Sequence, residues 1–429
     1  RQMCIRDSAL SRPSINNEAT AFSDFSTNES LVWLHADACV GAQLSNSPFA
    51  NGVPSSPDEV RLICTPAQWQ AMNTDLGLVS GQEFQLGRDI DFSNSSGNTT
   101  IANVFKANLR GNFHTLKNGT QPLLNSMTGF ANSRSSIRNL KIDGFDIDLS
   151  DDASAFSRGV IVNYIFSSAA SDTEGVEIED IELTNSSVDL AGSGAEGALG
   201  GALGEITFAP GSSNGVSSVA AGNNERASIR NIKSRVDISS DTMDGDLSMG
   251  GLVGKIQGGA NKNVSLEYNR VGFEDNSVEP ADTQRVSLNG HSKVGGLVGE
   301  MNNSEVRIGN IAYVDVQVSQ AGAQYIGGLV GYATGEIQVN NSFGDLLFNP
   351  TIASNYVGGV LGGMVNDNNL NIDGSLGKVL IPDGTNIKVE YVGGLLGYAN
   401  YTSAPSFKIR NSKGLLDTES DGSFYGGII

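Results

Sequence analysis

A box of the form Gly-Gly-Leu-Val-Gly recurs through the second half of the sequence. Its paired glycines are Gly200 and Gly201, Gly250 and Gly251, Gly295 and Gly296, Gly327 and Gly328, Gly358 and Gly359, and Gly393 and Gly394. Counted up to Gly426, which begins a seventh box, the intervals between successive first glycines are 50, 45, 32, 31, 35 and 33 residues. A single repeat of this size cannot bury its apolar face alone, so neighbouring repeats must stack on one another. The recurrence therefore predicts an elongated repeat array.

The segments between the boxes indicate β-strands. Apolar and polar residues alternate in residues 314–318 and 387–391, which is the period of a strand with one buried face. The 53 glycines and the low share of charged residues, 17%, also favour turns and strands over long helices. Equivalent strands in stacked coils pair in parallel, and parallel crossovers are right-handed in about 98% of cases. We predict an all-β fold, a right-handed parallel β-helix or β-solenoid.

Glycine and asparagine are expected to define each coil. Paired glycines allow a positive φ or a close approach to the next coil, where a Cβ would clash. An asparagine follows a strand-like run in several repeats, and stacked asparagines can form a hydrogen-bonded ladder at a turn. The predicted ladder comprises Asn231, Asn310, Asn341 and Asn411, and Gly374 departs from it. Gly129-Phe130-Ala131 is interpreted as a degenerate first box.

The N-terminal part differs from the repeats. Residues 1–8 resemble a translated sequencing adapter and are excluded from the fold prediction, and residues 9–62 are predicted to be a loosely structured leader. Residues 63–77 are predicted to form a short capping helix, with Thr65 as N-cap and Pro66 in the first turn. The solenoid then occupies 78–429. Because the chain stops at Ile429 inside a box, we expect an uncapped last coil and end-to-end association.

Cys4 lies in the excluded segment 1–8, so two cysteines remain, Cys39 and Cys64. An even pair that flanks a segment rich in Pro, Ser and Asn is typical of one extracellular disulfide. Two buried thiols are the alternative.

At the boxes the chain resembles bacterial surface proteins that carry the GLUG motif, which occurs in adhesin-like proteins and in some immunoglobulin A peptidases. The resemblance covers roughly residues 60–429. It implies a secreted or cell-surface location, while the motif itself carries no catalytic information. The sequence contains three histidines and no His-Glu-x-x-His pair, so the zinc site of the peptidase members is absent from these residues.

Missing motifs and the net charge exclude several further classes of function. Nucleophile-elbow and phosphate-loop motifs are absent, and the formal charge of -20 disfavours nucleic acid and anionic membranes as partners. No apolar run is long enough for a membrane span.

Asp146, Asp148 and Asp152 share an outward strand face and are candidate Ca²⁺ ligands, although a solvated polar face is the favoured interpretation.

Seven tyrosines cluster around the later boxes. They are Tyr325, Tyr332, Tyr356, Tyr391, Tyr398, Tyr401 and Tyr425. If the registers match they form a stripe, which could bind sugar rings, but in a solenoid such a stripe more often belongs to the core.

We therefore predict a non-catalytic, adhesin-like binding scaffold or stalk that acts outside the cell or on its surface. Its expected partner is a glycan or protein on a host or neighbouring cell. No cofactor is expected, and Ca²⁺ is the one candidate. A carbohydrate-active β-helix enzyme, and a spacer within a larger surface peptidase, are the alternative functions.

Overall fold

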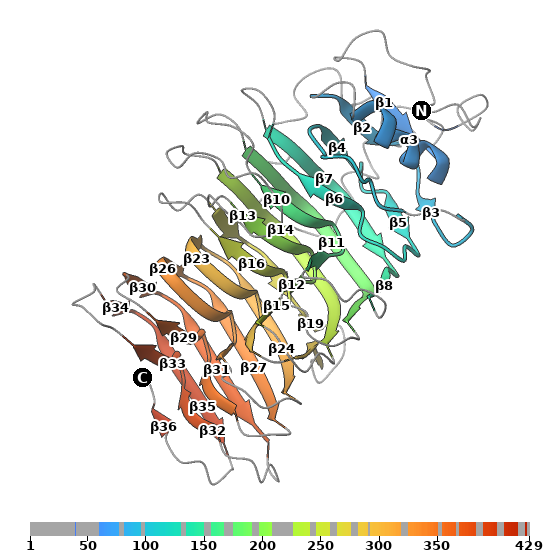
Figure 1. Ribbon diagram of the computed structural model, residues 1–429. Helices are drawn as coiled ribbons and strands as arrows, with labels where there is room; N and C mark the ends of the chain where they lie inside the picture. Colours follow the sequence, from blue (N-terminus) through green and yellow to red (C-terminus); the bar gives the residue numbers. More distant parts are fainter. Residues whose placement is uncertain are drawn as a thin grey trace, which may run out of the picture.

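The computed structural model shows an elongated stack of β coils (Figure 1). It describes residues 39, 60–76, 81–95, 99–129, 134–149, 156–166, 175–190, 197–207, 226–240, 246–257, 264–275, 282–290, 292–318, 325–350, 354–365, 369–382, 389–400, 407–418 and 425–426. Residues 1–8, and all of the predicted leader apart from Cys39 and residues 60–62, lie outside this set.

Each later coil contains a short strand that ends at the first glycine of the box. We call these the pre-box strands, and they pair in parallel along the stack. They are β9 (Phe156–Gly159), β12 (Gly197–Gly200), β15 (Leu247–Gly250), β22 (Lys293–Gly295), β25 (Tyr325–Gly327), β28 (Ser354–Gly358), β32 (Val389–Gly393) and β36 (Tyr425–Gly426).

A second set of strands begins within the box, and we call these the post-box strands. They also pair in parallel from coil to coil. They are β6 (Leu124–Met127), β10 (Val162–Phe166), β13 (Leu203–Thr207), β16 (Val253–Gln257), the start of β23 (Val298–Val306), the start of β26 (Val330–Asn340), β29 (Leu361–Val365) and β33 (Leu396–Asn400).

The rest of each coil runs through a corner, with strands on both sides of it. Before the corner lie β1 (Arg61–Ile63), β2 (Glu83–Leu86), β4 (Asn108–Arg110), β17 (Val264–Glu267), β30 (Leu370–Asp373) and β34 (Phe407–Arg410). After it lie β3 (Ile90–Asp91), β5 (Thr115–Lys117), β8 (Asp146–Asp148), β18 (Arg270–Val271), β21 (Val286–Asn289), β24 (Ile311–Val318), β27 (Phe343–Pro350), β31 (Leu376–Ile381) and β35 (Lys413–Thr418). Three long strands bend around the corner: β7 (Arg134–Asp143), β11 (Gly175–Leu190) and β14 (Arg226–Ser240).

Parallel pairing between successive coils makes the chain a parallel β-solenoid, as the sequence predicts. Among the described residues, one pair of strands is antiparallel. It joins β19 (Phe273–Asp275) to β20 (Asp282–Gln284), and these two strands form a hairpin that belongs to one coil only. The core lies inside the stack and consists mainly of aliphatic side chains in register, with aromatic side chains such as Trp69, Phe84 and Phe145 among them. Along the post-box strands the buried column runs Val162, Leu203, Val253, Val298, Val330, Leu361 and Leu396. Burying one such side chain contributes about 1.5–3 kcal/mol relative to leaving it exposed.

The helix α3 (Pro66–Leu76) lies at the N-terminal end of the stack (Figure 1). Thr65 Oγ1 accepts a hydrogen bond from the Gln68 backbone N–H at 3.2 Å, and Gln68 Oε1 accepts one from the Cys64 N–H at 2.7 Å. These bonds satisfy donors at the helix start. Trp69 is fully buried and donates its indole N–H to the Thr99 carbonyl at 2.9 Å.

The boundary between leader, helix and coils differs from the expected one. Arg61–Ile63 form β1 and pair with Phe84–Leu86 in parallel register, so the first strand precedes the helix. Burial accounts for the difference, since Ile63 belongs to the main core and Leu62 packs with Cys39 and Cys64. Cys39 and Cys64 are joined by a disulfide with a Cα–Cα distance of 5.7 Å, and both residues are buried.

Candidate functional site

The box makes a corner too tight for side chains. None of its glycines has a positive φ, so close approach explains them rather than backbone conformation. A Cβ on the first glycine, Gly295, would lie 1.9 Å from the Val298 carbonyl oxygen. A Cβ on the second, Gly296, would lie 2.1 Å from the carbonyl oxygen of Gly328 in the next coil. The pre-box strand therefore enters this corner, and the post-box strand leaves it, with the two backbones close together.

The same geometry recurs at the other boxes. The first glycines are register partners in the pre-box sheet, and the second glycines stack from coil to coil. The first column consists of Gly200, Gly250, Gly295, Gly327, Gly358 and Gly393, and the second of Gly201, Gly251, Gly296, Gly328, Gly359 and Gly394.

One box has no clear sequence signature, and another lies elsewhere than its glycine suggests. Gly159 pairs with Gly200, so residues 159–163 occupy the box station of the preceding coil with only one of the glycines. The interpretation of Gly129 as a first box is wrong, because β6 pairs with β10 from Leu124 and Val162 onward. The equivalent box position in that coil is thus residues 121–125, and Gly129 lies beyond the strand.

The predicted asparagine ladder is divided between two positions. Asn231, Asn341 and Asn411 have φ values of 51°, 44° and 49°, the left-handed conformation that asparagine tolerates at a turn. Gly309 and Gly374, with φ values of 79° and 63°, occupy this station in the coils on either side of Asn341. The Asn231 and Asn411 amides donate to Asp180 at 2.6 Å and Asp373 at 3.0 Å.

Asn310 belongs to an inner ladder instead. Its side chain is fully buried beside Asn269, and the Asn269 amide donates to Asn310 Oδ1 at 3.0 Å. The Asn310 amide donates to the carbonyl oxygens of Leu266 at 2.9 Å and Arg307 at 2.7 Å. The placement of Asn310 in one column with the other three is therefore wrong by one position, because Gly309 takes the left-handed station.

The acidic Ca²⁺ candidates lie on the outer face of β8. Asp146 and Asp148 are exposed on either side of the buried Ile147, and Asp146 Oδ1 accepts a hydrogen bond from Ser187 at 2.6 Å. Asp152 lies outside the described residues. Within the described part of the chain, no group of three or more His, Cys, Asp or Glu side chains could hold a metal ion.

Five of the seven tyrosines meet on the outer face of the box corner, and we call Tyr325, Tyr332, Tyr356, Tyr391 and Tyr398 the tyrosine strip. Tyr325, Tyr356 and Tyr391 are register partners on the pre-box strands. Their rings stack, with centroid distances of 5.0 Å and 5.3 Å and interplanar angles of 17° and 21°. Tyr332 and Tyr398 come from post-box strands, with centroids 4.7 Å from Tyr325 and 4.2 Å from Tyr356.

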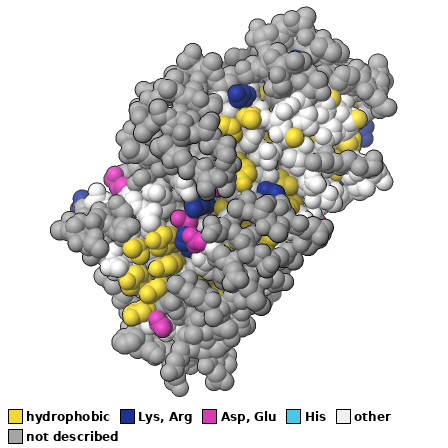
Figure 2. Space-filling view, in the orientation of Figure 1, with side chains coloured by type: hydrophobic (Ala, Val, Ile, Leu, Met, Phe, Trp, Pro, Cys, Tyr) yellow, Lys and Arg dark blue, Asp and Glu magenta, His cyan; other side chains and the backbone are white. Residues whose placement is uncertain are grey.

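The tyrosine strip is a surface feature, so its assignment to the core is wrong. Its neighbours Ile326 and Val357 point inward and are fully buried, whereas the tyrosines alternate with them on the opposite face. Tyr391 is 42% exposed. Figure 2 shows hydrophobic-class side chains, which include tyrosine, gathered over β29 and β33 with basic and acidic side chains beside them. Tyr401 and the side chain of Tyr425 lie outside the described set.

A group of charged residues adjoins the strip, and we call Asp246, Lys255, Lys293 and Glu300 the lysine cluster. Lys293 Nζ lies 2.8 Å from both Asp246 Oδ2 and Glu300 Oε2. Lys255 Nζ lies 3.3 Å from the same Glu300 oxygen. Lys293 Nζ also lies 5.1 Å from the Tyr332 ring centroid, a cation–π contact that joins the cluster to the strip.

The charges in this cluster stabilise one another. Burial alone would raise the pKa of Glu300, but Lys255 and Lys293 outweigh it and lower that pKa. Burial would likewise lower the pKa of Lys293, but Glu300 and Asp246 raise it. Burial raises the pKa of Tyr325 and Tyr332, so their hydroxyls stay protonated at neutral pH.

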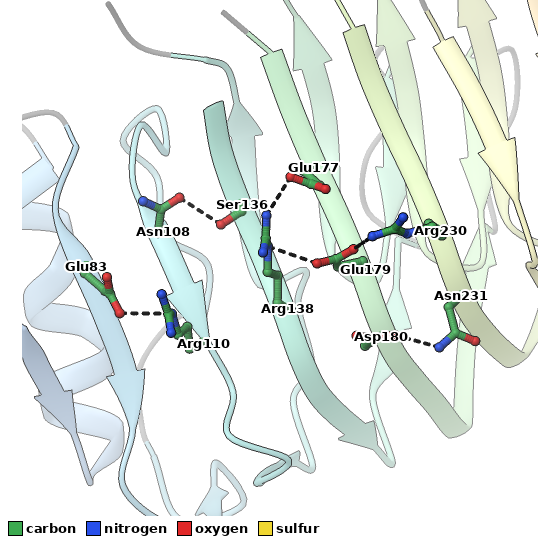
Figure 3. Close-up of polar contacts among 10 residues, drawn as sticks. All are labelled: Glu83, Asn108, Arg110, Ser136, Arg138, Glu177, Glu179, Asp180, Arg230 and Asn231. Carbon is green, nitrogen blue, oxygen red and sulfur yellow. Dashed lines mark hydrogen bonds and ion pairs between the residues drawn. The ribbon is translucent and has the colours of Figure 1, made fainter. Parts of the chain in front are cut away.

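A second outer face carries alternating charges (Figure 3). Arg138 and Arg230 both contact Glu179, which lies between them in the register of β7, β11 and β14. Farther along the same column, Arg307 Nη1 lies 3.0 Å from Glu267 Oε1. Because opposite charges neutralise one another from coil to coil, this face favours a role in coil register rather than ligand binding.

No protein-family model matches the sequence, and no curated protein matches it significantly. Among solved structures, the chain is similar to "a putative immunoglobulin A1 protease from Bacteroides ovatus", known at 1.30 Å resolution. The TM-score is 0.45 and the identity 17%, over 82% of this chain and 86% of that one. A similarity at this level carries no argument about activity. The described residues contain no helix with the length and apolarity needed to cross a membrane.

Proposed function

We propose that the chain is a non-catalytic, adhesin-like binding scaffold, and that the tyrosine strip is its contact surface for a glycan or protein on a host or neighbouring cell. The observation that carries the proposal is the gathering of five tyrosines on the outside of the box corner. Contiguous apolar surface outside a core is typical of an interaction site, and tyrosine is enriched in such sites.

The lysine cluster lacks the pKa shifts that a glycosidase site needs. A glycosidase needs one carboxyl group whose pKa is raised so that it can act as general acid. Glu300 and Asp246 flank Lys293, but the pKa of each is lowered. The pKa of Lys293 is raised, which makes it a poor general base. These directions support a structural role for the cluster beside the strip.

A location outside the cell is supported by the disulfide between Cys39 and Cys64. Disulfides persist in oxidising environments and are rare in the cytosol. The stacked coils also suit a stalk, so a spacer within a larger surface protein is the second candidate function. In that case the strip would be dispensable for binding to cells.

The test compares the full chain with a variant in which Tyr325, Tyr356 and Tyr391 are replaced by Ala. Tyr313→Ala is the matched control, because Tyr313 lies on another strand set, where its ring packs 5.5 Å from Phe343. Binding to bacterial and epithelial cells and to a glycan array is measured. We expect the triple variant to bind at least about tenfold more weakly, since hot-spot aromatics each contribute more than about 1 kcal/mol.

Two outcomes would contradict the proposal. Either the full chain binds no cell or glycan, or the triple variant binds as well as the parent while retaining its circular-dichroism spectrum. Release of reducing or unsaturated sugars from a polymer would favour the carbohydrate-active enzyme instead.

A further inference from the structure

The rings of the tyrosine strip cover one another's faces. Tyr356 is stacked between Tyr325 and Tyr391, with centroid distances of 5.0 Å and 5.3 Å. Side chains on a strand stand roughly perpendicular to the sheet, so each phenol hydroxyl lies at the outer tip. The pre-box part of the strip therefore presents ring edges and a row of hydroxyls, one from each coil, at about the 4.8 Å spacing of parallel strands.

Charge in the neighbouring cluster is already compensated. Lys293 is shared by two carboxylates, and Lys255 faces Glu300. Anionic ligands would have to displace these contacts and would meet a protein with a formal charge of -20. Polyhydroxylated, uncharged ligands would not, and they match a row of groups that both donate and accept hydrogen bonds.

We propose that this row of hydroxyls binds a neutral polysaccharide chain that lies along the solenoid axis and contacts successive coils. The inference rests on the proposed function and specifies its ligand. Hydrogen bonds to hydroxyls along the row, rather than the packing of one sugar on one ring face, supply the recognition. Affinity consequently rises with the length of the polymer until the strip is filled, because each added contact contributes to the same complex.

Gly363 is a positioning residue for the row. It lies between Tyr332 and Tyr398 in the post-box register, where it interrupts the tyrosines. A Cβ at Gly363 would lie 2.0 Å from Tyr325 Cδ1 and 2.5 Å from Cε1. The missing side chain thus makes room for the Tyr325 ring, and Gly363→Ala displaces that ring while every tyrosine remains.

Affinity electrophoresis of the full chain tests the ligand class. The neutral probes are β-glucan, mannan and xyloglucan, and the acidic probes are alginate and polygalacturonate. We expect retardation by at least one neutral polymer and by neither acidic one. The decisive variant replaces Tyr325, Tyr356 and Tyr391 by Phe, which keeps the stacked rings and removes the hydroxyls. It should bind at least about tenfold more weakly, and Gly363→Ala should also weaken binding.

Failure of this inference differs from failure of the proposed function. Unchanged binding by the Phe variant would overturn the hydroxyl mechanism, and retardation by acidic polymers alone would overturn the ligand class. If no neutral polymer binds but the chain still attaches to cells through the tyrosine strip, the ligand inference is wrong and the binding function stands. Absence of any attachment overturns both.

Discussion

At the scale of single residues, the adjacent glycines Gly362 and Gly363 have different structural roles. At Gly362 an added Cβ would lie 2.4 Å from the Ile326 backbone nitrogen and 2.6 Å from the Gly331 carbonyl oxygen. At Gly363 it would meet only the ring of Tyr325 at such close range. Backbone atoms in paired strands cannot move aside, whereas a ring at the surface can rotate.

Substituting each of these glycines with Ala separates the two roles. We expect Gly362→Ala to lower the free energy of unfolding by about 1–3 kcal/mol or more, as overpacking does. Gly363→Ala should change it by less than about 1 kcal/mol, because the clash is with a movable side chain. Urea unfolding followed by circular dichroism measures both. Equal losses for the two variants would show that Gly363 is also needed for the backbone.

The lysine cluster predicts how stability depends on pH. The folded-state pKa of Glu300 is lowered, so its contribution is present above the unfolded value of about 4.3 and is lost as the pH falls through the folded pKa. The pKa of Lys293 is raised, so its contribution is full below about 10.4 and is lost as the pH rises through the folded pKa. The two contributions are therefore both present near pH 7.

Glu300→Gln tests this assignment. Removing one partner of a largely buried ion pair leaves Lys255 and Lys293 less compensated, although Lys293 keeps Asp246. We expect a loss of about 1–3 kcal/mol at pH 7, measured by urea unfolding, and a difference from the parent that shrinks as the pH falls below the unfolded value of about 4.3. A difference that stays constant between pH 3 and 7 would mean that the charge of Glu300 is not the cause.

At the scale of elements, the corner that carries the asparagines, which is not the box corner, uses polar side chains in two distinct ways. Asn341 adopts the left-handed conformation on the outside, where glycine serves in adjacent coils. Asn310 lies inside and satisfies backbone carbonyls between strands. Farther along the stack, the buried Ser342 and Ser375 continue this inner ladder, and Ser375 Oγ accepts a hydrogen bond from the Ser342 N–H at 3.3 Å.

Two asparagine variants distinguish these uses. Asn310→Ala leaves the Leu266 and Arg307 carbonyls without the amide donor, and we expect it to destabilise the fold by about 1–3 kcal/mol. Asn341→Gly should remain within about 1 kcal/mol of the parent, because glycine adopts a positive φ without strain. Thermal unfolding of both variants provides the comparison. A larger loss for Asn341→Gly would mean that the outer amide matters more than the inner one.

At the scale of the whole molecule, a solenoid is stabilised mainly by contacts between neighbouring coils. The disulfide ties Cys39 to the start of the helix, next to the first strands. It closes a loop with a sequence separation of 25 residues, which corresponds to about 3–4 kcal/mol if the loop entropy of the unfolded chain dominates. Because coils contact only their neighbours, this stabilisation should remain local.

Replacing Cys39 and Cys64 by Ser tests that locality through amide hydrogen exchange. We expect faster exchange in β1, β2 and α3 and unchanged exchange in β24 to β33, since the later coils do not contact the bond. The parent chain under the same conditions is the control. Uniform acceleration along the whole stack would show that the solenoid unfolds as one unit.

The sequence by itself determines the fold class, because glycine boxes and period-two alternation specify coils with one buried face. It also places a cysteine pair where a bond forms, and it indicates that the tyrosines share a station. Only the tertiary structure decides on which side they lie. Tyr325 and Tyr332 are seven residues apart, yet their rings meet because the box turns the chain back sharply between them.

Register explains the remaining differences. The segments between boxes vary in length, so sequence spacing does not show that Asn310 is one position removed from the station of Asn341, or that Gly159 belongs with the box glycines. Pairing between coils settles both, because a shift of one residue reverses the face of every side chain in a strand. The surface that we propose for binding therefore results from the alignment of several coils. No single repeat contains that surface.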